Sequence, residues 1–124
     1  MEKKSSGLCS DERKMLMKVN TDFSDGRLHI FIEGELDHHA AKKVMTAIEN
    51  EIDANLPREC VLDMKRLTFM DSSGIAVILK THRRMNEVGG RLCVENAQKQ
   101  PMRVIDAAGI ERIVKITTMA KEYS

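Results

Sequence analysis

The segment after the first fourteen residues alternates between hydrophobic and polar positions, as a strand with one buried face does. The positions that carry the two alternating stretches are Met15, Met17 and Val19, and then Leu28, Ile30 and Ile32. Asp25-Gly26 interrupts the alternation between the two stretches. Two alternating runs around a short turn predict a β-hairpin, with folding expected to begin near Met15.

Three later segments repeat hydrophobic residues every three or four positions, which is the spacing of a helix with one buried side. The three stripes comprise Ala41, Val44, Met45, Ile48 and Ile52; Ile75, Ile78, Leu79, His82 and Met85; and Met102, Ile105 and Ala108. The first stripe ends near the Asn55-Leu56-Pro57 break, and the others end before Gly89-Gly90 and Gly109. Asp37 suits the N-cap of the first helix, and Pro101 suits the first turn of the third.

Three short apolar runs predict further strands of a sheet interior, one before, one between and one after the last two helical segments. They are Cys60-Val61-Leu62, Leu92-Cys93-Val94 and Val114-Lys115-Ile116. The predicted order is β-β-α-β-α-β-α-β, and repeated strand-helix-strand units require right-handed crossovers. We therefore predict a single α/β domain over residues 15–124, with a mixed, mostly parallel sheet and helices packed against it, preceded by a flexible tail over residues 1–14.

Composition narrows the classes of function. Twenty Lys and Arg against 19 Asp and Glu leave a net charge of +1, so the charge favours neither nucleic acid nor an anionic membrane as partner. Cys9, Cys60 and Cys93 lack the spacing of a zinc site and are odd in number, so we expect reduced, buried thiols. The sequence contains neither a signal peptide nor a transmembrane segment, so we expect a cytoplasmic location.

The segment Phe69-Met70-Asp71-Ser72-Ser73-Gly74 follows a predicted strand and precedes the strongest helical stripe. Ser72 and Ser73 are therefore expected at a helix N-terminus, where free N–H groups and the helix dipole favour a phosphate. We expect Gly74 to keep the backbone unobstructed there. Phosphorylation would add about −1.5 to −2 charges beside Asp71 and could repel a docked partner. Helix capping alone also explains the tetrapeptide Asp71-Ser72-Ser73-Gly74.

Two segments resemble the signature segments of the STAS-domain anti-sigma factor antagonists, and within that family those of sporulation. They are Gly34-Glu35-Leu36-Asp37-His38-His39 and Phe69-Met70-Asp71-Ser72-Ser73-Gly74-Ile75. Gly89-Gly90-Arg91-Leu92 and Ala108-Gly109-Ile110 resemble later landmarks of the family, so the similarity extends over roughly residues 17–117.

The resemblance implies a partner-switching cycle and no cofactor for this chain, which would be a substrate and not an enzyme. The unphosphorylated form would bind an anti-sigma factor that is also a serine kinase, and so release a sigma factor. The kinase would phosphorylate Ser72, and a PP2C-type phosphatase would reverse this step. The implied partner surface comprises Asp37, Asp71, Ser73, Gly74 and Ile75. The free protein is expected to be a monomer.

Other functions remain open from the sequence. A STAS scaffold or sensor whose serine is never phosphorylated is the main alternative. Asp37-His38-His39 also matches the short signature of a metal-dependent phosphoesterase family, but such sites need further ligands from other loops. A serine hydrolase would need a base beside Ser72, and no G-x-S-x-G motif is present. We therefore expect no metal site and no catalysis.

Two residue groups are interpreted as structural. Basic side chains gather at Lys80, His82, Arg83, Arg84 and Arg91, and we interpret them as a solvated helix face rather than a phosphate-binding patch. Met45, Met64 and Met85 stand at helical or strand spacing and are expected to fill the core.

Overall fold

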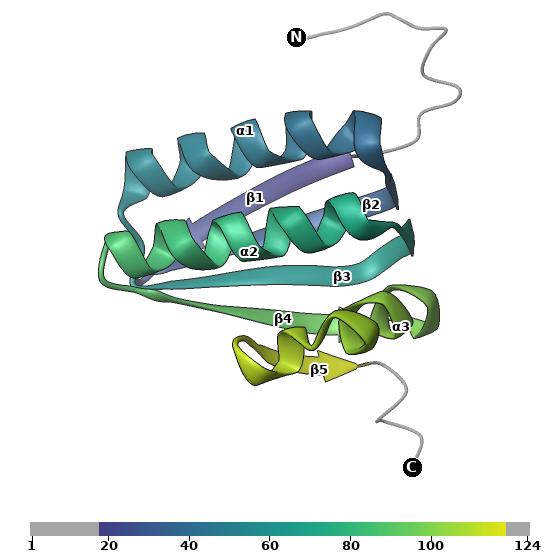
Figure 1. The fold of residues 1–124 in the computed structure, drawn as a ribbon. Coiled ribbons are helices and arrows are strands. Elements are labelled where there is room, and N and C mark those ends of the chain that lie inside the picture. The colour runs from purple at the N-terminus through teal and green to yellow at the C-terminus, as the bar shows by residue number, and fades with distance from the viewer. Residues whose placement is uncertain (1–17, 119–124) are drawn as a thin grey trace, which may run out of the picture.

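The computed structural model describes residues 18–118, which form one five-stranded sheet and three α-helices (Figure 1). In chain order the elements are β1 (Lys18–Ser24), β2 (Arg27–Leu36), α1 (His38–Asn55), β3 (Glu59–Met70), α2 (Ser72–Glu87), β4 (Arg91–Ala97), α3 (Lys99–Ala108), the 3-10 helix η3 (Ile110–Arg112) and β5 (Lys115–Thr118). This order confirms the predicted α/β fold. The expected tail over residues 1–14 and the expected start at Met15 lie outside the described residues.

The strands lie side by side in the same order as in the chain, from β1 to β5. β1 pairs antiparallel with β2, and every later pair is parallel. Because right-handed crossovers that always step in one direction place their helices on one side, α1, α2 and α3 all lie on the same face of the sheet (Figure 1). Within residues 18–118 no helix covers the other face.

The core lies between the sheet and this helical layer. Its aliphatic character follows the predicted stripes, because Val44, Ile48 and Ile52 of α1 are fully buried against the sheet. Met64 and Met85 are also fully buried and Met45 is 8% exposed, so the prediction that these methionines fill the core is confirmed.

The turns and helix ends lie where the sequence predicts them. Asp25 and Gly26 both have positive φ, 53° and 78°, which is the backbone of a two-residue type I′ hairpin turn. Helix α1 ends at a left-handed Leu56, just before Pro57 stops the helix, and α3 ends at a left-handed Gly109. These turns set the directions in which β2, β3 and β5 begin.

Three details differ from the sequence-based expectations. The last apolar run was expected in the sheet interior, but β5 begins at Lys115 and lies at the sheet edge. Strand β3 is twelve residues long, far beyond its short apolar run, because it stays paired with β2 as far as Met70, whereas its pairing with β4 ends at Asp63. Cys60 is buried as expected, whereas Cys93 is only half-buried; both are free thiols, and Cys9 lies outside the described residues.

No helix among residues 18–118 has the length and apolar character needed to cross a membrane.

Candidate functional site

The carboxyl ends of β2 and β3 meet at one edge of the sheet, and each strand leads directly into a helix. Leu36 and Met70, the last residues of the two strands, are register partners. The Asp71 N–H donates a hydrogen bond to the Leu36 carbonyl at 3.3 Å, which joins the two strand ends. Asp37 and Asp71 therefore begin two neighbouring helices side by side at the edge where parallel sheets commonly place ligands.

Asp71 is the N-cap of α2. Its backbone is extended (φ −107°, ψ −166°), and its Oδ1 accepts a hydrogen bond from the Ser73 N–H at 2.8 Å. The Asp71 carbonyl accepts a second bond, from the Gly74 N–H at 2.9 Å. These bonds explain why α2 begins at Ser72, as the capping rule predicts.

Ser72 is the first residue of α2 and its side chain is exposed. The N–H groups of Ser73 and Gly74 already donate to Asp71, so they are not free to bind a phosphate on Ser72. The expectation that first-turn N–H groups would hold that phosphate is therefore wrong for these two groups. A phosphate here would instead stand beside the Asp71 carboxyl group and add to its negative charge.

Asp37 is the N-cap of α1 and is half-buried. Its Oδ1 accepts a hydrogen bond from the Ala40 N–H at 2.9 Å, and this bond holds the pKa of the Asp37 carboxyl below its usual value. His38 and His39, which follow it, are exposed on the first turn of the helix. Among the described residues, the cluster with metal-ligating geometry involves none of these three side chains.

Gly74 and Ile75 have different environments from Ser72. Gly74 is buried, and a Cβ built on it would overlap Met70 Cγ, lie 2.5 Å from Met70 Sδ and lie 3.3 Å from Leu36 Cδ2. The missing side chain therefore lets α2 pack closely on the ends of β2 and β3. Ile75 is half-buried and packs against the core, so part of it remains at the surface.

Gln100, on the first turn of α3, holds the end of β3 in place. Its Oε1 accepts a hydrogen bond from the Met70 N–H at 2.8 Å, and its Nε2 donates to the Met70 carbonyl at 3.0 Å. Gln100 could not be identified from the sequence, because nothing in the local pattern shows that α3 reaches the end of β3. This pair of bonds fixes the residue that precedes Asp71.

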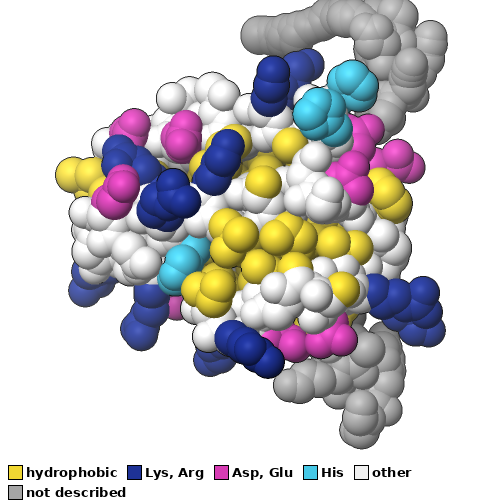
Figure 2. Space-filling model, in the orientation of Figure 1, with side chains coloured by type: hydrophobic (Ala, Val, Ile, Leu, Met, Phe, Trp, Pro, Cys, Tyr) yellow, Lys and Arg dark blue, Asp and Glu magenta, His cyan; other side chains and the backbone are white. Residues whose placement is uncertain are grey.

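Hydrophobic side chains form a band between α2 and α3, and acidic and histidine side chains lie near the end where α1 and α2 begin (Figure 2). The partly exposed apolar residues of α2 and α3 are Ile75, Leu79, Met102 and Val104. An exposed hydroxyl beside an apolar band and two capping carboxylates is an arrangement suited to docking a protein.

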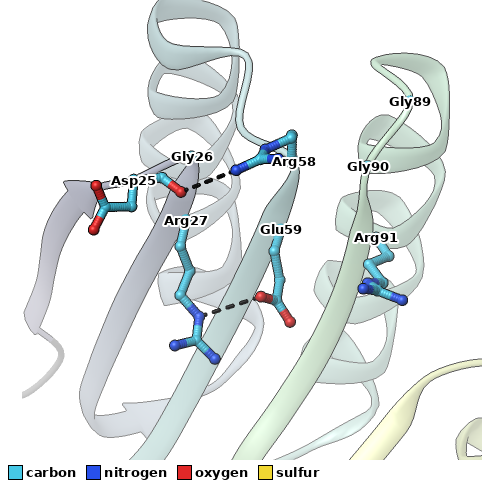
Figure 3. Close-up of a pocket in the computed structure, with 8 residues that line it drawn as sticks. All are labelled: Asp25, Gly26, Arg27, Arg58, Glu59, Gly89, Gly90 and Arg91. Carbon is cyan, nitrogen blue, oxygen red and sulfur yellow. Dashed lines mark hydrogen bonds and ion pairs between the residues drawn. The ribbon is translucent and has the colours of Figure 1, made fainter.

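A separate pocket of about 520 Å³ lies at the other end of the strands from Ser72, where the parallel strands β2, β3 and β4 begin (Figure 3). Arg27, Arg58 and Arg91 line it, but Arg27 Nε lies 3.3 Å from Glu59 Oε1, and Arg58 Nη2 donates to the Asp25 carbonyl at 3.4 Å. These contacts already engage two of the three guanidinium groups.

The residues interpreted as a basic helix face do not converge on one point. Arg84 is ion-paired with Asp53 of α1 and with Glu87, and it so links the two helices. Lys80 and Arg83 are exposed. The histidine side-chain hydrogen bonds within residues 18–118 join His29 to Asp63 and His82 to Asn86.

The family model of the STAS domain matches residues 18–122. The anti-sigma F factor antagonist of Paenibacillus polymyxa is 32% identical over 102 residues, covering 82% of this chain and 87% of the relative. The anti-sigma-B factor antagonist of Bacillus subtilis is 26% identical over 111 residues, covering 85% of this chain and 96% of the relative.

Solved structures give the same result. The unphosphorylated form of the anti-sigma factor antagonist SpoIIAA has a TM-score of 0.71 and 25% identity, covering 86% of this chain and 93% of that one. The phosphorylated form of SpoIIAA, described as a Bacillus cell fate determinant, has a TM-score of 0.64 and 25% identity, covering 86% and 96%. From its sequence, its fold and these relatives, this chain belongs to the STAS domain family.

Proposed function

We propose that this chain is an anti-sigma factor antagonist, that its direct partner is an anti-sigma factor with serine kinase activity, and that Ser72 is the switch. The two relatives at 32% and 26% identity carry the name of antagonist, and SpoIIAA has been solved in both an unphosphorylated and a phosphorylated form. A small domain with an exposed serine at the end of the sheet where α1 and α2 begin is suited to a regulator that cycles between two phosphorylation states. We call this end of the sheet, around Asp37 and Ser72, the docking edge. We expect it in the cytoplasm, together with its partners.

The observation that carries the proposal is the position of Ser72. Its hydroxyl is exposed at the first residue of α2, while the backbone around it is held by Asp71, Leu36 and Gln100. A kinase can reach this hydroxyl without unfolding the domain. Because its surroundings are rigid, adding a phosphate changes the charge of the docking edge more than its shape.

The unphosphorylated edge would contact the partner through Asp37, Ser73 and Ile75, around the hydroxyl of Ser72. Gly74 is buried, so its contribution is to set the position of α2. A phosphate on Ser72 would add its charge beside Asp71, and like charges brought together at an interface cost several kcal/mol. The partner would then dissociate, and a PP2C-type phosphatase would restore the binding form.

The first experiment incubates the protein with its cognate anti-sigma kinase and ATP and measures the intact mass. We expect one added phosphate in the wild type, none in Ser72→Ala, and one in the matched control Ser73→Ala. Peptide mapping then assigns the modified residue. A chain that gains no mass would support the unphosphorylated scaffold or sensor instead. A gain that persists in Ser72→Ala would show that Ser72 is not the switch.

The second experiment measures the affinity of the same partner for Ser72→Asp. We expect binding weaker by about tenfold or more, because a charge is placed in the docked edge. Ser72→Asn serves as the control of similar size without charge, and it should bind much as the wild type does. Equal affinities for Ser72→Asp and Ser72→Asn would contradict the electrostatic mechanism.

A further inference from the structure

Three side chains on the sheet face that carries no helix converge on one point. His29 of β2, Asp63 of β3 and Glu95 of β4 each offer a ligand atom, and these atoms all lie within 4.8 Å of one another. His29 Nε2 lies 3.1 Å from Asp63 Oδ2. The three residues come from the three central strands of the sheet, so their spacing is fixed by the strand register.

The cluster brings two carboxyl groups close together, and a cation between them would offset their charges. Asp63 and Glu95 are register partners on adjacent strands, so two carboxyl groups face the same small region. Carboxylates a few ångströms apart repel each other, and the repulsion is greater where water is partly excluded. Asp63 is only 8% exposed, and hydrogen bonds already stabilise its negative charge. A cation would in addition offset its repulsion with Glu95.

Asp63 is also held in one orientation. Its Oδ1 accepts hydrogen bonds from the Lys65 N–H at 3.0 Å and from Asn96 Nδ2 at 3.2 Å. Oδ2 is thereby directed at His29, and the ring of His29 is stacked on Phe31 with centroids 4.2 Å apart. Metal sites owe much of their affinity to such surrounding bonds, because these fix the ligands before the ion arrives.

We propose that His29, Asp63 and Glu95 form a binding site for a divalent transition-metal ion of the zinc type. One imidazole and two carboxylates are suitable ligands for Zn²⁺, at about 2.0–2.2 Å from the ion, so two ligand atoms of a tetrahedral site lie roughly 3.3–3.5 Å apart. The His29 to Asp63 separation is already close to this value. Glu95 needs only a small side-chain movement.

The ion binds the lone pair of His29 Nε2 in the neutral tautomer that carries its hydrogen on Nδ1. A hydrogen that faces Asp63 on Nε2 moves to Nδ1 through solvent, so no net proton is released, and the ion takes its place between the two ligands. The double positive charge of the ion then offsets both carboxylates, and water fills the fourth position. The ion so joins β2, β3 and β4 across the face opposite the helices, away from Ser72. This site does not depend on the proposed switching function.

The test titrates Zn²⁺ into the full chain by isothermal calorimetry. We expect one Zn²⁺ per chain, and an affinity at least about tenfold lower in His29→Gln and in Glu95→Gln, since even residues that only support a metal ligand change affinity by about that factor. Glu95 is half-buried and its replacement by Gln keeps the shape of the side chain, so this variant decides the matter if His29→Gln fails to fold. Zn²⁺ should also raise the melting temperature of the wild type and not that of Glu95→Gln.

Controls distinguish this site from other metal-binding side chains. The double variant His38→Gln/His39→Gln removes the exposed histidine pair, and Cys93→Ser removes the half-buried thiol on the same sheet face. Both should bind Zn²⁺ as the wild type does. The proposal is overturned if the wild type binds no Zn²⁺, if Glu95→Gln binds with unchanged affinity, or if affinity is lost only in a control variant.

Discussion

Gly74 lies where α2 leaves β3, and replacing it with alanine tests how closely these two elements are packed. The new Cβ would overlap Met70 Cγ, lie 2.5 Å from Met70 Sδ and lie 3.3 Å from Leu36 Cδ2. Carbon atoms in contact normally stay about 3.5–4.0 Å apart. Met70 and Leu36 are both fully buried, so neither side chain can move aside into solvent.

The expected magnitude follows from two opposing contributions. Forcing an extra methyl group into a filled core costs about 1–3 kcal/mol. Alanine is a better helix former than glycine by about 1 kcal/mol, which offsets part of this cost. We therefore expect Gly74→Ala to lower the free energy of unfolding by about 1 kcal/mol, within a range of about 0–2 kcal/mol. Urea denaturation followed by circular dichroism measures this as a lower midpoint with an unchanged slope.

A double-mutant cycle identifies the cause. Met70→Ala removes the atoms that the new methyl group would meet, so Gly74→Ala should be neutral or stabilising in that background. Gly89→Ala is the matched control: it strains a positive φ of 81°, but no atom lies within 4 Å of its Cβ. Its cost should be the same in both backgrounds. If the effect of Gly74→Ala is the same with Met70→Ala as without it, the packing argument is refuted.

Three further predictions concern single residues. Asp71→Ala should destabilise the domain by about 1 kcal/mol in chemical denaturation, because the Ser73 N–H loses its acceptor, whereas Asp71→Ser should retain most of the cap. Burial raises the pKa of the Cys60 thiol to about 12, with smaller contributions from Cys93 and Glu59. Iodoacetamide at pH 8 should therefore leave Cys60 unmodified in the folded protein and label it after denaturation; labelling at equal rates would contradict this. Since the unfolded thiol ionises near 9 and the folded thiol near 12, Cys60 should also lower stability as pH rises from about 9 towards 12, which a comparison with Cys60→Ala can isolate.

The helices and their starting points were predictable because they follow from local rules. The stripe that contains Val44, Ile48 and Ile52 predicted α1, and Asp37 and Asp71 predicted where two helices begin. Capping depends on a side chain and an N–H group a few residues apart, so a short segment contains all the information required. The Asp25-Gly26 turn and the left-handed Gly109 are local in the same sense.

The candidate site was predictable only in part. The exposed position of Ser72 follows from its place after the N-cap. The packing role of Gly74 and the hydrogen bonds between Gln100 and Met70 could not be predicted, because each depends on a residue from another element. The same reason explains why β5 was predicted in the interior of the sheet although it lies at the edge. A short apolar run looks the same in both places.

The sequence by itself determined the elements, their order, the turns between them and the exposed serine at the start of a helix, since all of these depend on neighbours within a few positions. Only the tertiary structure decided which strands are internal, how the ends of β2 and β3 come together, and that His29, Asp63 and Glu95 meet on one face. These three residues lie far apart in the chain, and strand register alone brings them into contact. Register is set by pairing across the whole sheet, so no local pattern contains it.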